Sequence, residues 1–296
     1  MTFGSLITAM ITPFNAAGEV DYTQAQHLAE YLYANGSESL VISGTTGESP
    51  TLSKEEKLKL FSAIVEVAKG RGLVIAGTGS YDTAGSVELT KAAAKMGVDG
   101  ILAVAPYYNK PPQEGLYQHF TAIAAAVGIP VMLYNIPGRT GINILPQTIA
   151  RLSKIDNIFA VKESSGSMEQ VSQIFQLIDE DFLVYSGDDS LTLPVLSLGG
   201  AGIVSVAGHI VGNEIKAMLE MYFNGDVCGA AEMHKYLYPV FSNIFVMANP
   251  IPIKYCVNKL GFFAGECRLP LIPLEESART ILDQMLSDMD IKKIVL

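Results

Sequence analysis

Lys162 could act as a nucleophile, because it ends an apolar run of the chain, Ile158–Lys162. A lysine at this point is expected to project from a buried strand rather than from a solvated helix face. Burial disfavours the charged ammonium and leaves the neutral amine that Schiff-base chemistry requires. The alternative is a lysine that marks the end of the strand and reaches water. The choice between the two depends on the other candidate residues.

Two adjacent threonines follow another apolar run, in the segment Gly44–Glu48. The glycines before and after them let the backbone approach a ligand closely, and the amides and hydroxyls of Thr45 and Thr46 can donate to a carboxylate. A tight turn with a helix cap is the alternative reading of this segment. Glu48 is expected to be a structural hydrogen-bond partner rather than a catalyst.

Tyr134 and Arg139 lie close together in the sequence. The phenol of Tyr134 could relay a proton during imine formation, which needs acid and base steps. A core tyrosine with a satisfied hydroxyl is the alternative. Arg139 lies in a loop rich in proline and glycine and suits a planar carboxylate, although a solvated loop arginine is also consistent with it. Glu163, beside the lysine, is expected to be structural.

The elements that position these residues alternate between apolar runs and amphipathic stretches. The apolar runs are Leu6–Ile11, Leu40–Ser43, Leu73–Ala76, Gly100–Ala103, Val131–Tyr134, Ile158–Lys162, Leu183–Ser186 and Gly202–Val206. The helical patterns between them cover 23–35, 53–69, 83–97, 113–126, 146–153, 167–179, 189–198 and 212–223. Continuous apolar strands separated by helices predict parallel strands buried on both faces. About eight such units predict an α/β fold, the (β/α)8 TIM barrel.

An open doubly wound sheet is the rival fold, but it normally has a glycine-rich phosphate loop after its first strand, and residues 12–15 are Thr-Pro-Phe-Asn. Ser53 and Glu56 predict a capping box, and Gly36, Gly97 and Gly128 are expected to end helices in a left-handed conformation.

The alternation of strands and helices stops near residue 226. Segments 226–246, 251–260 and 275–288 look helical with no strand between them. We therefore expect a barrel over residues 1–225 and a C-terminal helical domain over 226–296. In such a barrel the active site lies where the strands end and their following loops begin. The candidate residues above, with the segments 106–111 and 186–188, fall at five such ends.

The composition limits the classes of partner. The chain has 296 residues and a formal net charge of −10, which argues against binding to nucleic acid or to a membrane surface. No signal peptide and no membrane span are recognised, so a cytoplasmic location is expected. The three cysteines form no C-x-x-C pair and the four histidines are scattered, so neither a disulfide framework nor a metal site is expected.

The sequence resembles the dihydrodipicolinate synthase family, within the pyruvate-dependent class I aldolase superfamily. The resemblance covers essentially the whole chain. It is carried by the segments 44–48, 106–111, 134–141, 161–164 and 249–254. N-acetylneuraminate lyases are similar elsewhere, but they typically have a serine after the first glycine of the first segment. They also lack the Tyr-Tyr-Asn-basic-Pro loop of the second segment and the arginine of the third.

The resemblance implies roles for the candidate residues. Lys162 would form an imine with pyruvate, whose carboxylate Thr45 and Thr46 would hold. Tyr134, Thr45 and Tyr108 would relay protons, with Tyr108 reaching into the site of a neighbouring subunit. The protein would therefore be at least a dimer, and a homotetramer built as a dimer of dimers is expected.

The second substrate follows from the same resemblance. Arg139 would receive the carboxylate of L-aspartate 4-semialdehyde, and the carbonyl of Gly187 and the backbone at Val204 would line the pocket. No cofactor is implied, because the protonated imine is the electron sink. The reaction would belong to diaminopimelate and lysine biosynthesis. A sugar-acid retro-aldolase of the same superfamily is the alternative enzyme, and a barrel kept as a non-catalytic scaffold is an alternative of another class.

One departure concerns regulation. Family members that are inhibited by lysine bind it at a dimer interface with histidines, an asparagine and a glutamate. The matching positions here are Lys54, Lys57, Tyr81 and Gly85. Cationic side chains without a carboxylate should repel a lysine ligand, so lysine feedback is expected to be weak or absent. Tyr107 would then keep only a packing role at the interface.

Overall fold

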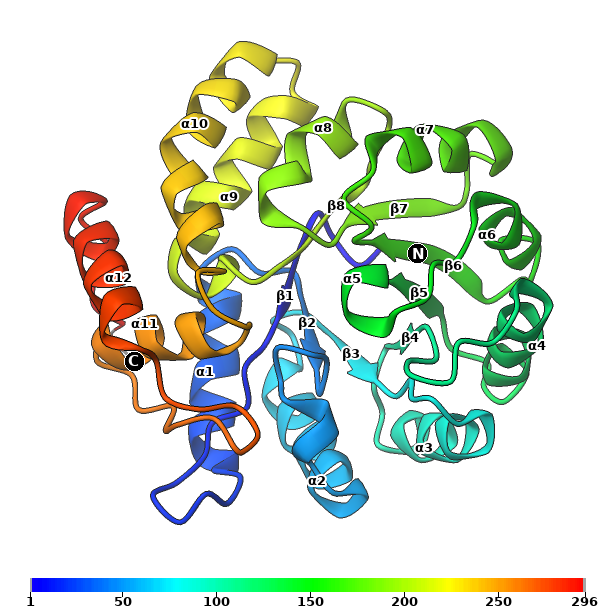
Figure 1. Cartoon of the computed structure of the whole chain (residues 1–296), viewed down its shortest axis with the longest axis horizontal. Helices are drawn as coiled ribbons and strands as arrows, with labels where there is room; N and C mark the ends of the chain where they lie inside the picture. Colours follow the sequence, from blue (N-terminus) through cyan, green and yellow to red (C-terminus); the bar gives the residue numbers. More distant parts are fainter. Residues whose placement is uncertain (1, 295–296) are drawn as a thin grey trace. The chain divides into compact units, whose positions relative to one another are not determined.

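Eight parallel strands close into a barrel in chain order, β1 to β8 (Figure 1). The computed structural model describes residues 2–294. The strands are β1 (Leu6–Ala9), β2 (Ser39–Ile42), β3 (Leu73–Gly77), β4 (Gly100–Val104), β5 (Val131–Asn135), β6 (Ile158–Glu163), β7 (Leu183–Ser186) and β8 (Gly202–Ser205). Each predicted strand is present within two residues at either end, and the predicted (β/α)8 barrel is confirmed.

Helices follow the strands in the expected alternation. They are α1 (Tyr22–Ala34), α2 (Lys54–Ala68), α3 (Thr83–Lys95), α4 (Gln113–Ala124), α5 (Pro137–Thr140), α6 (Pro146–Leu152), α7 (Met168–Leu177), α8 (Thr192–Leu196), α9 (Gly208–Phe223), α10 (Val227–Asn243), α11 (Ile251–Lys259) and α12 (Glu276–Asp288). The 3₁₀ turns η1 (Ser49–Thr51) and η2 (Asp189–Leu191) complete the set. As predicted, residues 227–294 are described as helices and loops without a strand, so the helical extension is confirmed.

Two helical features differ from the sequence-based expectation. The four-residue helix α5 was not predicted, because a Pro-Gly pair inside so short a segment has the composition of a turn. Helix α9 begins at Gly208 rather than at residue 212. Val211 has a non-helical backbone (φ −135°, ψ 38°), so the regular apolar period starts only after this kink.

The predicted helix caps are mostly present. The Ser53 hydroxyl accepts from the Glu56 amide (3.2 Å), and the Glu56 carboxylate accepts from the Ser53 amide (2.9 Å). Gly36 and Gly97 have φ of +94° and +87°. The prediction for Gly128 is wrong, since it is not among the residues with positive φ. Helix α4 has already ended at Ala124, and tight turns lead the chain away before residue 128.

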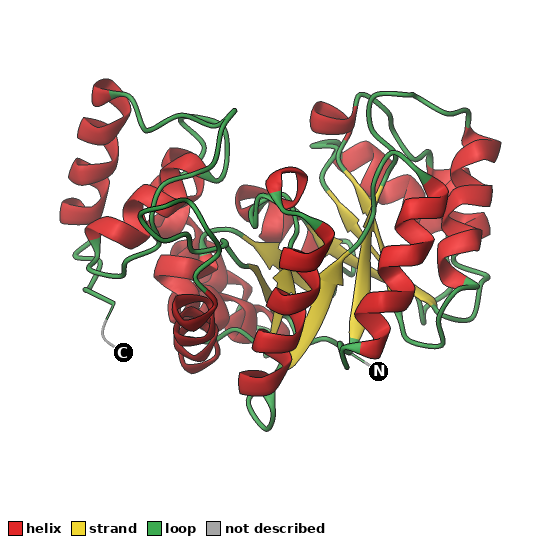
Figure 2. Ribbon diagram, turned by 90° about the horizontal axis from the view of Figure 1, so that it is seen from below, coloured by secondary structure: helices red, strands yellow, loops and turns green. Residues whose placement is uncertain are grey.

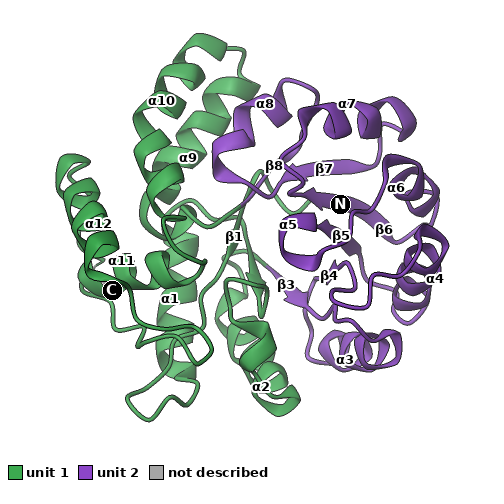
Figure 3. Cartoon of the chain, in the orientation of Figure 1, with its two compact units in different colours: residues 1–73, 205–296 green, residues 74–204 purple. Residues whose placement is uncertain are grey.

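The chain divides into two compact units (Figure 3). Unit 1 comprises residues 1–73 and 205–296, and unit 2 comprises residues 74–204. Within unit 1, α10 packs along α9, and α12 contacts α10 and α11. The proposed domain boundary at residue 225 is a different division of the chain and stays a prediction.

Unit 2 contains most of the candidate residues, on its strands or in the loops that follow them. Strands β4 to β7 pair in parallel with one another. Their helices cover the outer side of this sheet, as the strand and helix layers of Figures 1 and 2 show. Nearly every residue of these strands is buried. Burial on both faces explains why the strands read as continuous apolar runs rather than as alternating patterns.

A buried histidine joins two elements of unit 1. The His209 ring accepts a hydrogen bond at Nε2 from the Ile11 amide (3.1 Å) and donates at Nδ1 to the Val206 carbonyl (2.8 Å). These two contacts require the neutral ring with its proton on Nδ1. Burial, opposed by the hydrogen bond to Val206, lowers the pKa of His209 to about 4.

This lowered pKa predicts a loss of stability in mild acid. An unfolded chain binds a proton at this ring near pH 6.5, whereas the folded His209 resists protonation down to about pH 4. The stabilising contribution is complete above pH 6.5 and decreases by about 3 kcal/mol as the pH falls to 4. We expect the free energy of unfolding of the H209Q variant, measured by urea denaturation, to depend less steeply on pH between 6.5 and 4. The slope should not vanish, because burial also lowers the pKa of His119 to about 4. An unchanged slope would contradict the assignment.

Candidate active site

Lys162 and Tyr134 lie side by side on β6 and β5. They are register partners in the parallel pairing, and each is 5% exposed. The Lys162 Nζ lies 4.2 Å from the centre of the Tyr134 ring. Among residues 2–294, neither the Lys162 amine nor the Tyr134 hydroxyl makes a hydrogen bond. The two side chains therefore lie together at the carboxyl ends of β5 and β6, and neither polar group is bound to the rest of the described chain.

The backbone of Gly187 lies next to the Lys162 side chain. It directly follows β7, and its amide donates to the Glu163 carbonyl (2.8 Å). A Cβ atom at position 187 would lie 2.8 Å from Cε of Lys162 and closer still to Oγ of Ser164. A side chain at 187 would force the side chains of Ser164 and Lys162 to shift, so glycine at this position leaves the lysine where it is. Val204 is buried within the neighbouring strand β8.

A buried polar network holds the carboxyl ends of β5 and β6. The Glu163 carboxylate accepts from the side-chain amides of Asn135 (2.9 Å) and Gln170 (3.2 Å) and from the Ser165 backbone amide (2.6 Å). Asn143 accepts from Asn135 (2.7 Å) and donates to Gln170 (2.7 Å). Glu163 is thus a structural hydrogen-bond partner, as expected.

The three amide residues of this network were not found from the sequence. Asparagine and glutamine carry no periodic or motif signal of their own. The one usable indication was Asn135, a polar residue that directly follows Tyr134 in an otherwise apolar strand. A buried polar residue in a strand requires a partner, and that partner is distant in sequence.

Arg139 lies on α5, in the loop that follows Tyr134. Its side chain is exposed. The loop is fixed by the Thr140 hydroxyl, which donates to the Ile142 carbonyl (2.8 Å), and by the Ile144 amide, which donates to the Asn135 side chain (2.9 Å). The network around Glu163 therefore also anchors the far end of the loop that carries Arg139.

Tyr108 projects away from unit 2. It is 91% exposed, and its φ of +75° lies in the left-handed region that a tyrosine rarely adopts. Its amide donates to the Thr140 carbonyl (3.4 Å), and the Asn109 side chain donates to the Tyr81 carbonyl (2.9 Å). The rings of Tyr81 and Tyr107 meet edge to face, with centroids 5.4 Å apart.

Thr45 and Thr46 lie in unit 1, in a compact loop after β2. Thr45 is partly exposed, whereas Thr46 is buried. The Thr12 hydroxyl donates to the Gly47 carbonyl (2.6 Å). The Thr46 hydroxyl accepts from the Asn249 side chain (2.9 Å). The loop ends at Glu48, whose carboxylate is buried against Lys254 (2.9 Å).

Comparison with models of known families identifies the family of this chain. Residues 2–289 match the model of the dihydrodipicolinate synthetase family. The chain belongs to this family. The sequence-based resemblance is confirmed, and the chain is a lyase of the aldolase type. The alternative enzyme, a sugar-acid retro-aldolase of the same superfamily, is not favoured by this match or by the relatives of this chain.

Relatives of known name agree over nearly the full length. A 4-hydroxy-tetrahydrodipicolinate synthase from Heliobacterium modesticaldum is 56% identical over 286 residues, which cover 97% of this chain and 95% of that protein. The Cyanidioschyzon merolae enzyme, solved with lysine bound, is 48% identical with a TM-score of 0.96, covering 97% of this chain and 98% of that one. The Acinetobacter baumannii enzyme, solved in complex with pyruvate, is 38% identical with a TM-score of 0.95, covering 98% and 100%.

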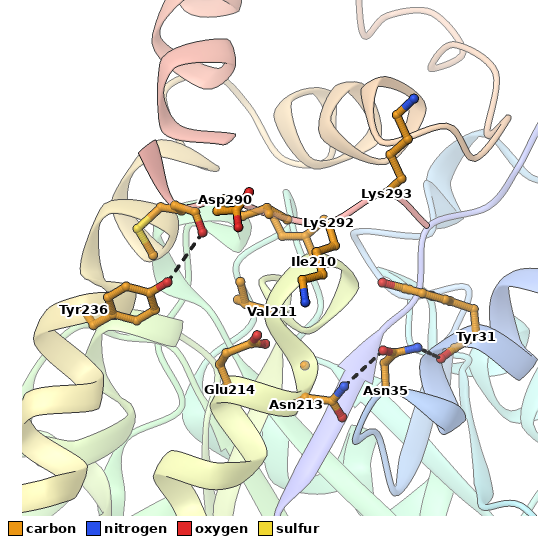
Figure 4. Close-up of a pocket in the computed structure, with 13 residues that line it drawn as sticks. Tyr31, Asn35, Ile210, Val211, Asn213, Glu214, Tyr236, Asp290, Lys292 and Lys293 are labelled. Carbon is orange, nitrogen blue, oxygen red and sulfur yellow. Dashed lines mark hydrogen bonds between the residues drawn. The ribbon is translucent and has the colours of Figure 1, made fainter. Parts of the chain in front are cut away.

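A cavity of about 520 Å³ lies in unit 1, and none of the predicted site residues lines it. Figure 4 shows Tyr31, Glu214 and Lys292 among the side chains that do. The lining mixes acidic and basic groups. In residues 2–294 no three His, Cys, Asp or Glu side chains are grouped to ligate a metal, and no helix is long and apolar enough to cross a membrane.

Proposed function

We propose that the chain condenses pyruvate with L-aspartate 4-semialdehyde through a Schiff base on Lys162, the 4-hydroxy-tetrahydrodipicolinate synthase reaction. The observation that carries the proposal is the largely buried Lys162 side chain, whose amine lies 4.2 Å from the centre of the Tyr134 ring and, like the Tyr134 hydroxyl, makes no hydrogen bond within residues 2–294. An amine held in this way is available to attack a carbonyl. The reaction would serve lysine and diaminopimelate biosynthesis in the cytoplasm.

The chemistry starts at the ketone of pyruvate. The Lys162 amine adds to the carbonyl carbon, and the resulting carbinolamine loses its hydroxyl as water to form the imine. Tyr134 is placed to donate the proton that this hydroxyl needs. Loss of a proton from the methyl group gives an enamine, whose carbon attacks the aldehyde. The amine of the adduct then adds to the imine carbon, closes the ring and releases Lys162.

The remaining predicted residues bind and orient the substrates. Thr45 and Thr46 hold the pyruvate carboxylate, and Thr45 and Tyr108 continue the proton relay. Gly187 and Val204 line the pocket with backbone groups. The exposure and left-handed backbone of Tyr108 support its role in the site of a second copy. The protein is then at least a dimer, and a dimer of dimers fits the same proposal.

An assay with both substrates tests the proposal. Purified protein with pyruvate and L-aspartate 4-semialdehyde should form the cyclic product, detected by mass spectrometry. A polyhydroxy aldehyde in place of the semialdehyde should give no condensation. Faster turnover with the polyhydroxy aldehyde would overturn the proposal in favour of a sugar-acid aldolase, and turnover of neither would favour a scaffold.

The R139A variant should separate the two substrates. A bidentate arginine–carboxylate contact is worth about 3 kcal/mol, so the KM for the semialdehyde should rise roughly a hundredfold. Trapping of pyruvate by borohydride should be unchanged, because Arg139 is not assigned to pyruvate. R151A is the matched control, since Arg151 pairs with Glu114 on the exposed surface. Equal losses for both substrates would contradict the assignment.

Lysine should inhibit this protein weakly or not at all. Two of the four positions expected to meet lysine carry the cationic residues Lys54 and Lys57, and none of the four carries a carboxylate. Initial rates with millimolar lysine should stay within twofold of those without it. Strong inhibition would refute the prediction and would align this chain with the Cyanidioschyzon merolae enzyme that was solved with lysine.

A further inference from the structure

The segment 249–254 has no role in the chemistry above, yet its two polar side chains are buried. Lys254, on α11, is 1% exposed. Its Nζ lies 2.9 Å from Oε1 of Glu48 and donates to the Glu266 carbonyl (3.0 Å). It also lies 4.0 Å from the centre of the Phe14 ring. The charged end of this lysine is therefore held by protein groups. Its ion-pair partner, Glu48, is 206 positions away in the sequence.

The partner of Lys254 ends the threonine loop. Glu48 has φ of +57°, a left-handed conformation, and its second carboxylate oxygen accepts from the Arg268 amide (2.8 Å). Burial lowers the pKa of Lys254, and the charge of Glu48 opposes this shift. A buried ion pair of this kind often adds no net stability over apolar replacements. Its value to the protein is then the geometry that it imposes on the loop.

Asn249 contacts the same loop at a second point. Its side-chain amide donates to Oγ1 of Thr46 (2.9 Å). Within residues 2–294 the Thr46 hydroxyl makes no other hydrogen bond. A hydroxyl has a single proton, and accepting from Asn249 leaves that proton free to point at a ligand. Asn249 therefore sets Thr46 up as a donor.

Arg268 binds the segment that follows Glu48 in the sequence. Its guanidinium binds both carboxylate oxygens of Glu56 (2.6 and 2.9 Å) and the carbonyls of Thr51 and Gly18 (2.8 Å each). Glu56 is also the third residue of α2, where it completes the capping box with Ser53. The base of the threonine loop and the start of α2 are therefore tied to one C-terminal stretch of chain.

We infer that Asn249 and Lys254 are positioning residues for pyruvate: they hold the Gly44–Glu48 loop so that Thr45 and Thr46 present donors to its carboxylate. This inference rests on the proposed function. It predicts that disturbing either residue weakens pyruvate binding at the threonine loop, while Lys162 chemistry at saturating pyruvate is kept.

The test measures how much pyruvate is needed to trap half of the protein with borohydride, followed by mass spectrometry. The variants are N249A and K254M. We expect roughly a tenfold rise in the half-saturating pyruvate concentration for each, as for loss of one hydrogen bond to a charged group. The plateau of trapped protein should stay the same. K259M is the control, because Lys259 lies on the same helix but pairs with Asp283 on the surface.

A double variant separates positioning from stability. K254M alone leaves Glu48 buried without its ion-pair partner and should lower the unfolding temperature, whereas E48Q/K254M should restore it. We expect the double variant to keep the raised pyruvate requirement. Normal half-saturation in the folded double variant and in N249A would overturn the inference. No adduct in the unsubstituted protein would overturn the proposed function, and the inference with it.

Discussion

The K162M variant should form no pyruvate adduct under borohydride and should lose roughly 10⁴-fold or more in kcat, the usual scale for removing a nucleophile. No other lysine is expected to replace it, because the reaction needs an amine beside the Tyr134 phenol, and the Lys162 Nζ lies 4.2 Å from that ring. Peptide mapping of the unsubstituted protein should place the adduct on Lys162.

The loss should not come from unfolding. The Lys162 amine makes no hydrogen bond within residues 2–294, so a methionine at this position breaks no hydrogen bond of the fold. Such a replacement is expected to leave the unfolding temperature equal or higher. K154M is the control, because Lys154 pairs with Asp179 on the exposed surface. A pyruvate adduct that persists in folded K162M would overturn the mechanism.

The barrel could be predicted because its strands are buried on both faces. Strands β4 to β7 then appear as apolar runs of four to six residues, separated by helical patterns. Local irregularity was harder to predict. The short helix α5 has the composition of a turn, and the kink at Val211 interrupts a segment whose apolar period becomes regular only after it.

The residues of the candidate site also fall into those that the sequence indicated and those that it did not. Lys162, Tyr134 and Arg139 were found because each is a chemically distinctive side chain at the end of a strand or in the following loop. Asn143 and Gln170 were missed because amides at ordinary spacings gain meaning only when the fold brings them to one carboxylate. The candidate catalytic residues could therefore be proposed from the sequence, whereas the residues that hold their surroundings could not.

Gly187 is where positioning should matter most, and G187A should lose at least roughly a hundredfold in kcat/KM for pyruvate. The added Cβ would lie 2.8 Å from Cε of Lys162, closer than non-bonded carbon atoms approach. Gly187 is held by its hydrogen bond to the Glu163 carbonyl, so the lysine side chain has to move. A displacement of about 1 Å at a reacting atom costs about 10²-fold in rate. Borohydride trapping should slow to the same extent.

A second substitution distinguishes a displaced lysine from a misfolded protein. The Ser164 hydroxyl lies even closer than Lys162 to the point that the new Cβ would occupy, and it is buried without a hydrogen-bond partner within residues 2–294. S164A alone should therefore leave stability and activity nearly unchanged. Combined with G187A it removes the closer clash, so the unfolding temperature should recover. The contact with Lys162 remains, so activity should stay low. Recovery of both in S164A/G187A would show that the lysine was never displaced, and that glycine at 187 only makes room for Ser164.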